Sequence, residues 1–121
     1  MKTLFATLVF LFATGAIPAQ NLHLQVGSTY LGCLTCYSTD PISVWNDVGE
    51  YGSPYGQYSI FNSVGMYGSD VGLHSPFNPV SSSPPVVVDE AGNFYGFLTI
   101  NSAISNRATF LEARKVYNYA Q

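Results

Sequence analysis

The sequence has little charge, and positive charge is almost missing from it. Charged residues make up 9% of the chain, and no Lys or Arg lies between residues 20 and 106. Proteins that bind nucleic acids need a basic face to neutralise phosphates, so the composition excludes that function. Binding driven by attraction to anionic lipid headgroups is excluded for the same reason.

Long apolar runs are also scarce. The longest spans residues 4–16, lies after Lys2 and is followed by a Pro-Ala pair. A membrane-spanning helix needs about 20 apolar residues, whereas a shorter run with a positive start and a small residue behind it is typical of a secretory signal peptide. The sequence therefore predicts a signal peptide over residues 1–19, with an uncleaved signal anchor as the alternative. It predicts one secreted or periplasmic domain over residues 20–121, without an integral membrane segment.

The usual signs of catalysis are missing. The Gly-x-Ser-x-Gly pattern of a nucleophilic serine is absent. The two histidines, His23 and His74, are not spaced as a pair of metal ligands. The acidic residues do not recur with the repeat described below, which argues against a repeated calcium site. We expect no cofactor and no metal, and the pattern favours a non-catalytic protein over an enzyme without deciding between them.

Only two cysteines are present, Cys33 and Cys36. A pair in an exported protein favours a disulfide. Along a continuous strand, however, Cα atoms three residues apart lie about 10 Å from each other, and a disulfide needs less than about 7 Å. A bridge therefore requires the strand to end in a turn at Leu34 or Thr35. Two buried thiols, or a redox or metal-binding pair, are the alternatives.

Two segments resemble each other and align without a gap. Residues 22–36 read LHLQVGSTYLGCLTC, and residues 86–100 read VVVDEAGNFYGFLTI. In each, apolar residues alternate, a turn containing Gly follows, and aromatic and aliphatic residues resume with a period of two, which predicts a β-hairpin. The second turn spans residues 89–93, with Gly92 expected at positive φ. The four strands are expected to form one antiparallel sheet, because an isolated hairpin is only marginally stable.

Between the hairpins, residues 43–80 repeat one phrase with a period of sixteen. The motif Ser-x-aromatic-Asn begins at Ser43, Ser59 and Ser75, and Gly recurs at fixed offsets. Ser and Asn stabilise turns by bonding nearby backbone groups, and Gly suits positive φ or a close approach of two backbones. The sequence predicts a chain of tight turns, each repeat anchored by one aromatic ring. A disordered Gly/Ser/Tyr linker is the alternative.

Aromatic residues of this insert are the candidate binding groups. Rigid rings with polar tips supply contact area at low entropic cost, and sugars stack on them. We expect one ring per repeat to be buried and some tyrosines to be exposed. The candidate binding residues are Trp45, Tyr51, Tyr55, Tyr58 and Tyr67.

The tail over residues 105–119 has apolar residues at helical spacing. Phe110, Ala113 and Tyr117 would share one face of a helix that begins at Ser105 or Asn106. The predicted fold is thus mainly β, with two hairpins flanking a Gly/Tyr/Ser-rich turn repeat and a short C-terminal helix.

One repeat matches a known pattern. Residues 46–55 read Asn-Asp-Val-Gly-Glu-Tyr-Gly-Ser-Pro-Tyr. Over residues 22–101 the chain resembles small secreted bacterial proteins that carry tandem Asn-x-x-Gly-x-Tyr-Gly-Ser-x-Tyr repeats, although Val71 replaces the last Tyr in the second unit. The resemblance implies secretion and a repeat architecture. It implies no activity and assigns no catalytic residue.

The sequence therefore predicts a secreted interaction module at the cell envelope or in the extracellular space. Its expected partner is an envelope polysaccharide or protein, bound by the tyrosine-rich repeat. One alternative is a small enzyme, such as a thiol–disulfide enzyme, that uses Cys33 and Cys36. Another is a structural matrix protein that self-assembles through the repeat.

Overall fold

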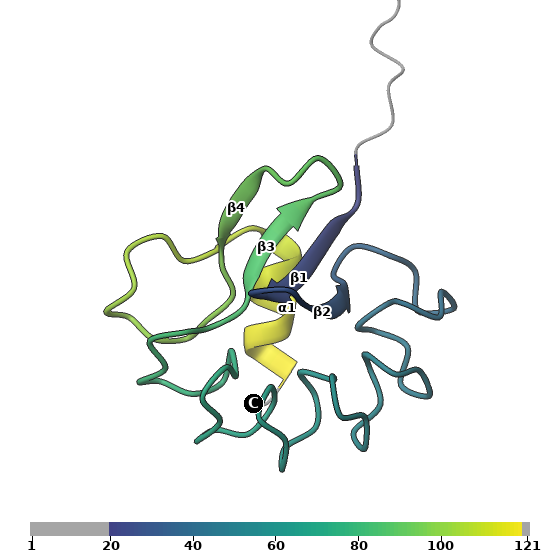
Figure 1. Cartoon of the computed structure of the whole chain (residues 1–121), viewed down its shortest axis with the longest axis horizontal. Coiled ribbons are helices and arrows are strands. Elements are labelled where there is room, and N and C mark those ends of the chain that lie inside the picture. Colours follow the sequence, from purple (N-terminus) through teal and green to yellow (C-terminus); the bar gives the residue numbers. More distant parts are fainter. Residues whose placement is uncertain (1–19, 120–121) are drawn as a thin grey trace, which may run out of the picture.

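A four-stranded antiparallel sheet forms the centre of the protein, as Figure 1 shows. The computed structural model describes residues 20–119, so the predicted signal peptide lies outside the described residues. The two predicted hairpins are confirmed, and they join through their first strands. The strand order is β2-β1-β3-β4, with β1 at Leu22–Val26, β2 at Thr29–Cys33, β3 at Val86–Asp89 and β4 at Phe94–Phe97.

The two hairpins are related by an approximate twofold axis through the β1–β3 pair. Equivalent positions in the two hairpins are 64 residues apart. Leu22 lies opposite Asp89, and its counterpart Val86 lies opposite Gln25. Leu24 and Val87 pair near the middle of the sheet, and both are fully buried. The matching sequences therefore form matching halves of one sheet.

Each edge strand contains a glycine at positive φ. Gly32 in β2 has a φ of 110°, and its counterpart Gly96 in β4 has a φ of 119°. A Cβ atom at Gly32 would lie 2.6 Å from Cβ of Tyr51, and one at Gly96 would lie 3.0 Å from the backbone nitrogen of Ala108. Both glycines let the edge strand approach the segment that follows it. Gly92, in the second turn, has a φ of 87°, as predicted.

The chain returns to the outer side of each edge strand and forms a short parallel bridge. Cys33 pairs with Ser43, and Phe97 pairs with Arg107. Each bridge partly covers the edge of the sheet and shields it from other chains. The bonds run from Cys33 N to Ile42 O (2.7 Å), Val44 N to Cys33 O (2.9 Å), Phe97 N to Asn106 O (2.8 Å) and Ala108 N to Phe97 O (2.7 Å).

One helix, α1, spans Leu111–Tyr119 and confirms the predicted C-terminal helix. The predicted start at Ser105 or Asn106 is wrong. Residues 106–108 cannot begin the helix, because their backbone groups bond to Phe97 in the sheet. The first helical bond runs instead from Arg114 N to Phe110 O. Within residues 20–119, no helix has the length and apolarity needed to cross a bilayer.

Residues 43–80, called the insert below, form no strand and no helix. Figure 1 shows the chain between β2 and β3 as an arc of outward-projecting loops, with α1 inside the arc. One apolar core joins the sheet, the insert and the helix. Its buried members are Leu24, Leu31, Leu34, Val44, Ile60, Phe61, Val87, Leu98, Ala108, Ala113 and Val116.

Candidate functional site

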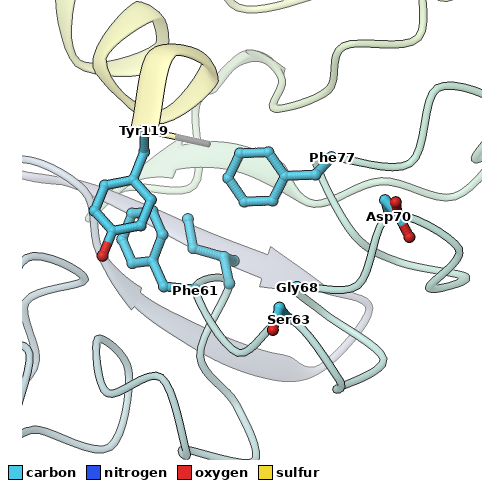
Figure 2. Close-up of a pocket in the computed structure, with 7 residues that line it drawn as sticks. Phe61, Ser63, Gly68, Asp70, Phe77 and Tyr119 are labelled. Carbon is cyan, nitrogen blue, oxygen red and sulfur yellow. The ribbon is translucent and has the colours of Figure 1, made fainter. Parts of the chain in front are cut away.

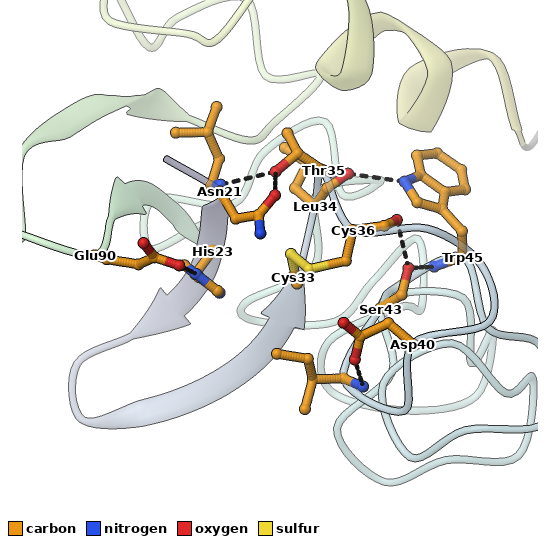
Figure 3. Close-up of a disulfide and its surroundings, with 12 residues drawn as sticks. Asn21, His23, Cys33, Leu34, Thr35, Cys36, Asp40, Ser43, Trp45 and Glu90 are labelled. Atoms are coloured by element: carbon orange, nitrogen blue, oxygen red, sulfur yellow. Dashed lines mark hydrogen bonds and ion pairs between the residues drawn. A yellow bond between two sulfur atoms is a disulfide. The ribbon is translucent and has the colours of Figure 1, made fainter. Parts of the chain in front are cut away.

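Cys33 and Cys36 form a disulfide, which is drawn in Figure 3. Strand β2 ends at Cys33, and the turn that follows brings the two Cα atoms to 5.5 Å. The geometric condition set by the sequence is therefore met, and the disulfide interpretation is confirmed. The interpretation as two buried free thiols is wrong, because the described chain has no free cysteine.

The disulfide turn is bonded to the start of the insert (Figure 3). Ser43 Oγ donates to the carbonyl of Cys36 at 3.0 Å and accepts from the Trp45 backbone N–H at 3.0 Å. The indole Nε1 of Trp45 donates to the Leu34 carbonyl at 2.8 Å. The only polar side-chain atom of Trp45 is therefore used inside the protein. Its ring acts as an anchor of the insert.

Hydrogen bonds divide the insert into consecutive β-turns. A backbone N–H donates to the carbonyl three residues earlier, and the residue that donates to one turn is the acceptor of the next. One step of four residues follows Gly49, and another follows Gly65. These shared residues, called junction residues below, are all Ser, Asn or Gly. They are Ser43, Asn46, Gly49, Ser53, Gly56, Ser59, Asn62, Gly65, Ser69, Gly72, Ser75, Asn78 and Ser81.

Side chains of the junction residues brace the turns a second time. Each Ser Oγ or Asn Oδ1 accepts a hydrogen bond from the backbone N–H two residues later, at 3.0–3.3 Å. This is the local bonding that makes these residue types favour turns. The amide groups of Asn46, Asn62 and Asn78 also donate to carbonyls six residues earlier, at 3.2, 2.9 and 2.8 Å.

Two glycines allow adjacent turns to touch. A Cβ atom at Gly68 would clash with the carbonyl oxygen of Asn62 and would lie 2.7 Å from that of Ile60. Gly52 has the equivalent relation to Asn46 and Val44. Both glycines are buried, so the turns stack backbone against backbone at these points. The insert is therefore an ordered structure, and the disordered-linker interpretation is wrong.

The predicted binding rings lie in different environments. Trp45 packs on Phe61 with ring centroids 5.6 Å apart, and Tyr51 packs edge-on against Tyr30 at 5.1 Å. Tyr58 and Tyr67 lie together, with centroids 6.2 Å apart, and both pack against the core. Tyr55 is 91% exposed. The structure brings Tyr58 and Tyr67 together, and of the five only Tyr55 is fully open to solvent.

A polar cluster lies on the first hairpin. The Tyr30 hydroxyl is 2.7 Å from Nδ1 of His23, and Nε2 of His23 is 3.4 Å from a carboxylate oxygen of Glu90. Burial, aided by the nearby Tyr51, raises the pKa of Tyr30 to about 12. Burial also raises the pKa of Tyr51. Both phenols are therefore neutral near pH 7, and the Tyr30 hydroxyl is hydrogen-bonded to His23.

A pocket of about 380 Å³ opens between the insert and α1 (Figure 2). None of the five predicted binding residues lines it. Its aromatic walls include Phe61 and Phe77, which the sequence marks as the buried rings of their repeats, and Tyr119 from the helix. The lining residues are Ile60, Phe61, Ser63, Gly68, Asp70, Phe77 and Tyr119.

Two further observations limit what the site can do. In the part of the chain that the structure describes, no three His, Cys, Asp or Glu residues are grouped so that they could hold a metal ion. Among the same residues, every buried polar side-chain atom has a hydrogen-bond partner.

Comparison with known proteins finds no matching family model, no similar curated protein and no similar solved structure.

Proposed function

We propose that this protein is a secreted, non-catalytic interaction module that acts at the cell envelope or in the extracellular space. The observation that carries the proposal is a set of uncharged side chains at the tips of the turns. Each follows a Ser or Asn junction residue by two positions, and each is at least 80% exposed. These tip residues are Val48, Tyr55, Val64, Val71 and Val80.

Their regular placement distinguishes the tip residues from scattered apolar surface residues. A single exposed Val on a soluble protein needs no explanation, but a recurring group of them marks an interaction surface. The turn uses only the backbone N–H of a tip residue, which donates to the junction side chain. Because the side chain has no part in the turn, it is free to meet a partner.

The proposal includes a structural role for the sixteen-residue phrase. We infer that each sixteen-residue phrase is one structural unit of five consecutive turns. Successive junction residues are three residues apart in four of these turns and four residues apart in the fifth. The aromatic ring of the unit faces inward and its tip residues face outward. The equivalent hydrogen bonds at Asn46, Asn62 and Asn78 support this inference. A unit braced in this way holds its tips on a rigid scaffold, which lowers the entropic cost of binding.

The expected partner is a polysaccharide or a protein of the envelope. The insert has no Lys or Arg, so it offers no basic group to a phosphate polymer. Its exposed Val and Tyr side chains suit the CH faces of sugars or an apolar protein surface. Tyr55 is the predicted binding residue best placed for this role, because Tyr51, Tyr58 and Tyr67 are half-buried.

Retention on isolated envelope material tests the proposal. We expect the exported protein to be retained on purified peptidoglycan, envelope polysaccharide or immobilised envelope proteins. The triple change Val48→Ser, Val64→Ser and Val80→Ser should abolish retention without lowering the melting temperature, because all three side chains are exposed. Tyr37→Ser is the matched control, since Tyr37 is 88% exposed but lies outside the insert. The proposal is contradicted if the wild-type protein is not retained on any of these materials. It is also contradicted if the triple variant is retained as well as the wild type.

The same tip residues also favour a second candidate, a self-assembling matrix protein. Exposed apolar groups on a rigid arc could contact a second copy as readily as a different partner. Static light scattering separates the two candidates. Particle mass that grows with concentration, and that the triple variant abolishes, supports self-assembly. A monodisperse monomer at high concentration removes this candidate and leaves the envelope module.

A further inference from the structure

The pocket between the insert and α1 has aromatic walls from two parts of the chain. Phe61 is buried, Phe77 is half-buried, and the Tyr119 side chain is 59% exposed. The ring centroids of Phe61 and Tyr119 lie 4.1 Å apart, and those of Phe61 and Phe77 lie 6.3 Å apart. Figure 2 shows these rings gathered on one side of the pocket. Because Phe61 is held in the core, its ring is in place before any ligand arrives.

The other side of the pocket is polar and carries one negative charge. Ser63 and Asp70 line this side, and Gly68 between them contributes no side chain (Figure 2). Among residues 20–119 the one ion pair is between His23 and Glu90, so Asp70 has no cationic partner there. Asp70 takes the place of Pro54 in the preceding repeat. The carboxylate is thus a feature of one repeat and is not needed by the turn.

The positive side chains of the described residues are occupied elsewhere or lie outside the pocket lining. The Arg107 guanidinium faces the Thr99 carbonyl at 3.5 Å, and that of Arg114 donates to the Thr109 carbonyl at 3.3 Å. Lys115 is exposed on α1 and does not line the pocket. Asp70 is therefore the one charged side chain among the residues that line the pocket.

We propose that this pocket binds an organic cation, an ammonium group carried on a compact apolar body. A cation is attracted to the electron-rich faces of aromatic rings, and a carboxylate across the pocket adds to that attraction. An anion would meet Asp70 and find no basic side chain. A volume of about 380 Å³ lies within the usual range for small ligands. The inference rests on the proposed function and deepens it, because it names one chemical group that an envelope partner would carry.

A pair of isosteric probes tests the role of charge. Choline and its neutral carbon isostere dimethylbutanol have the same shape, so only the charge differs. In titrations followed by NMR, we expect choline to shift the ring signals of Phe77 and Tyr119 and to bind at least fivefold more tightly than the isostere. Equal affinity for the two probes, or no shift with choline, overturns the proposal.

Two matched variants test the role of Asp70. Asp70→Asn keeps the shape of an exposed side chain and removes its charge, so it should leave the fold intact and weaken choline binding about fivefold. Asp47→Asn removes an exposed charge from the preceding repeat, outside the pocket, and should leave choline binding unchanged. Equal loss in both variants indicates a general charge effect and overturns the assigned site. Tyr119→Leu should also weaken choline binding, since it removes an exposed aromatic wall.

The source of the cation is distinguished by two further probes. Glucosamine represents an amino sugar, and N-acetyl-lysine amide represents a peptide side chain. Each probe is compared with the neutral form in which its charged amine is acetylated, the sugar amine in glucosamine and the ε-amine in the lysine probe. The probe that binds more tightly than its neutral form identifies the source. If the protein is retained on envelope material but binds none of the cationic probes, the pocket proposal fails and the module stands. If it binds choline but no envelope matrix, the pocket stands as a small-molecule site and the proposed function fails.

Discussion

The two halves of the sheet share one backbone plan and differ in how each is closed. The first half ends in the Cys33–Cys36 disulfide. The second half has Phe97 and Ile100 at the equivalent positions, and both are half-buried. In each half a parallel bridge then joins the edge strand to the following segment. The comparison shows that one half of the fold has a covalent bond where the other has two half-buried apolar side chains.

The halves also use different aromatic residues for a similar task. In the first, the Trp45 indole donates to the Leu34 carbonyl at 2.8 Å. In the second, the Tyr117 hydroxyl accepts from the Thr99 backbone N–H at 3.2 Å and donates to the Ala108 carbonyl at 2.7 Å. The first ring belongs to the insert and the second to α1. An aromatic side chain with one polar atom thus ties the end of each hairpin to the next part of the chain.

The largest expected effect on stability comes from replacing the equivalent glycines of the two edge strands, Gly32 and Gly96. Gly32→Ala should lower the free energy of unfolding by about 4 kcal/mol, and Gly96→Ala by about 3 kcal/mol, because each Cβ meets packed atoms at a positive φ. Gly27→Ala is the control: its φ is 57° but nothing lies within 4 Å, so about 1 kcal/mol is expected. Urea denaturation measures all three, and equal losses at Gly27 and Gly32 would contradict the close approach at β2.

The next effect concerns the disulfide, which only the first half has. Replacing both cysteines, Cys33→Ala with Cys36→Ala, should lower the free energy of unfolding by about 2 kcal/mol, as the loop entropy of a four-residue bridge implies. Ile100→Ala, the matched change in the second half, should cost about 1 kcal/mol, because the side chain is only half-buried. Thermal unfolding with and without reductant checks the difference. The Ile100 variant should still respond to reductant, whereas a double-cysteine variant that still responded would refute this role of the disulfide.

A smaller effect is expected in acid, where only the second hairpin turn should make stability depend on pH. Hydrogen bonds from the Asn93 side chain and backbone, the Tyr95 hydroxyl and the Ala91 N–H lower the pKa of Asp89 below its ordinary value. A lowered folded-state pKa contributes stability at higher pH, and that stability is lost as the pH falls below about 4. The counterpart in the first hairpin, Gln25, does not titrate. Asp89→Asn should therefore flatten the acid limb of the stability curve. An acid limb unchanged by this substitution would mean that Asp89 is not the group responsible.

The smallest effect is expected in base, where only the first hairpin has a tyrosine at the compared position. Burial raises the pKa of Tyr30 to about 12, and the counterpart in the second hairpin is Phe94, which does not titrate. Because the folded state favours the neutral phenol, its contribution to stability is complete below about pH 10 and is lost as the pH rises toward 12. Spectroscopic titrations of wild type and Tyr30→Phe should differ by one phenol that titrates near pH 12. A difference between the two titrations that lies near pH 10, the ordinary pKa of a phenol, would exclude the shift.

Local patterns in the sequence predicted the parts of the fold that depend on local structure. The hairpins, the positive φ of Gly92 and the C-terminal helix follow from periodicity and turn chemistry. The start of the helix could not be found in this way, because residues 106–108 are held outside the helix by backbone bonds to Phe97 at the end of β4. The sequence does not decide the disulfide for a related reason, because its geometry depends on where β2 ends.

The candidate site was only partly visible in the sequence. The sequence predicts that the aromatic residue of each repeat is buried. Phe61 is, whereas Trp45 and Phe77 are half-buried and pack against the core. Phe61 also lines a pocket, however, to which Tyr119 contributes from another part of the chain. Neither the aromatic residues nor the sixteen-residue spacing identifies the tip residues. Ser, Asn or Gly at almost every third position of the insert was the available signal, and it places Val48 and its equivalents at the turn tips.

Hydrogen exchange of the insert, with and without isolated envelope material, tests the binding role most directly. In the free protein, the N–H groups that donate within the turns should already be protected, because the insert is ordered before binding. Addition of the envelope material should slow exchange further at the tip residues and leave β1 and β3 unchanged. Unprotected turn amides in the free protein, or added protection confined to the sheet, would contradict a preformed binding surface on the insert.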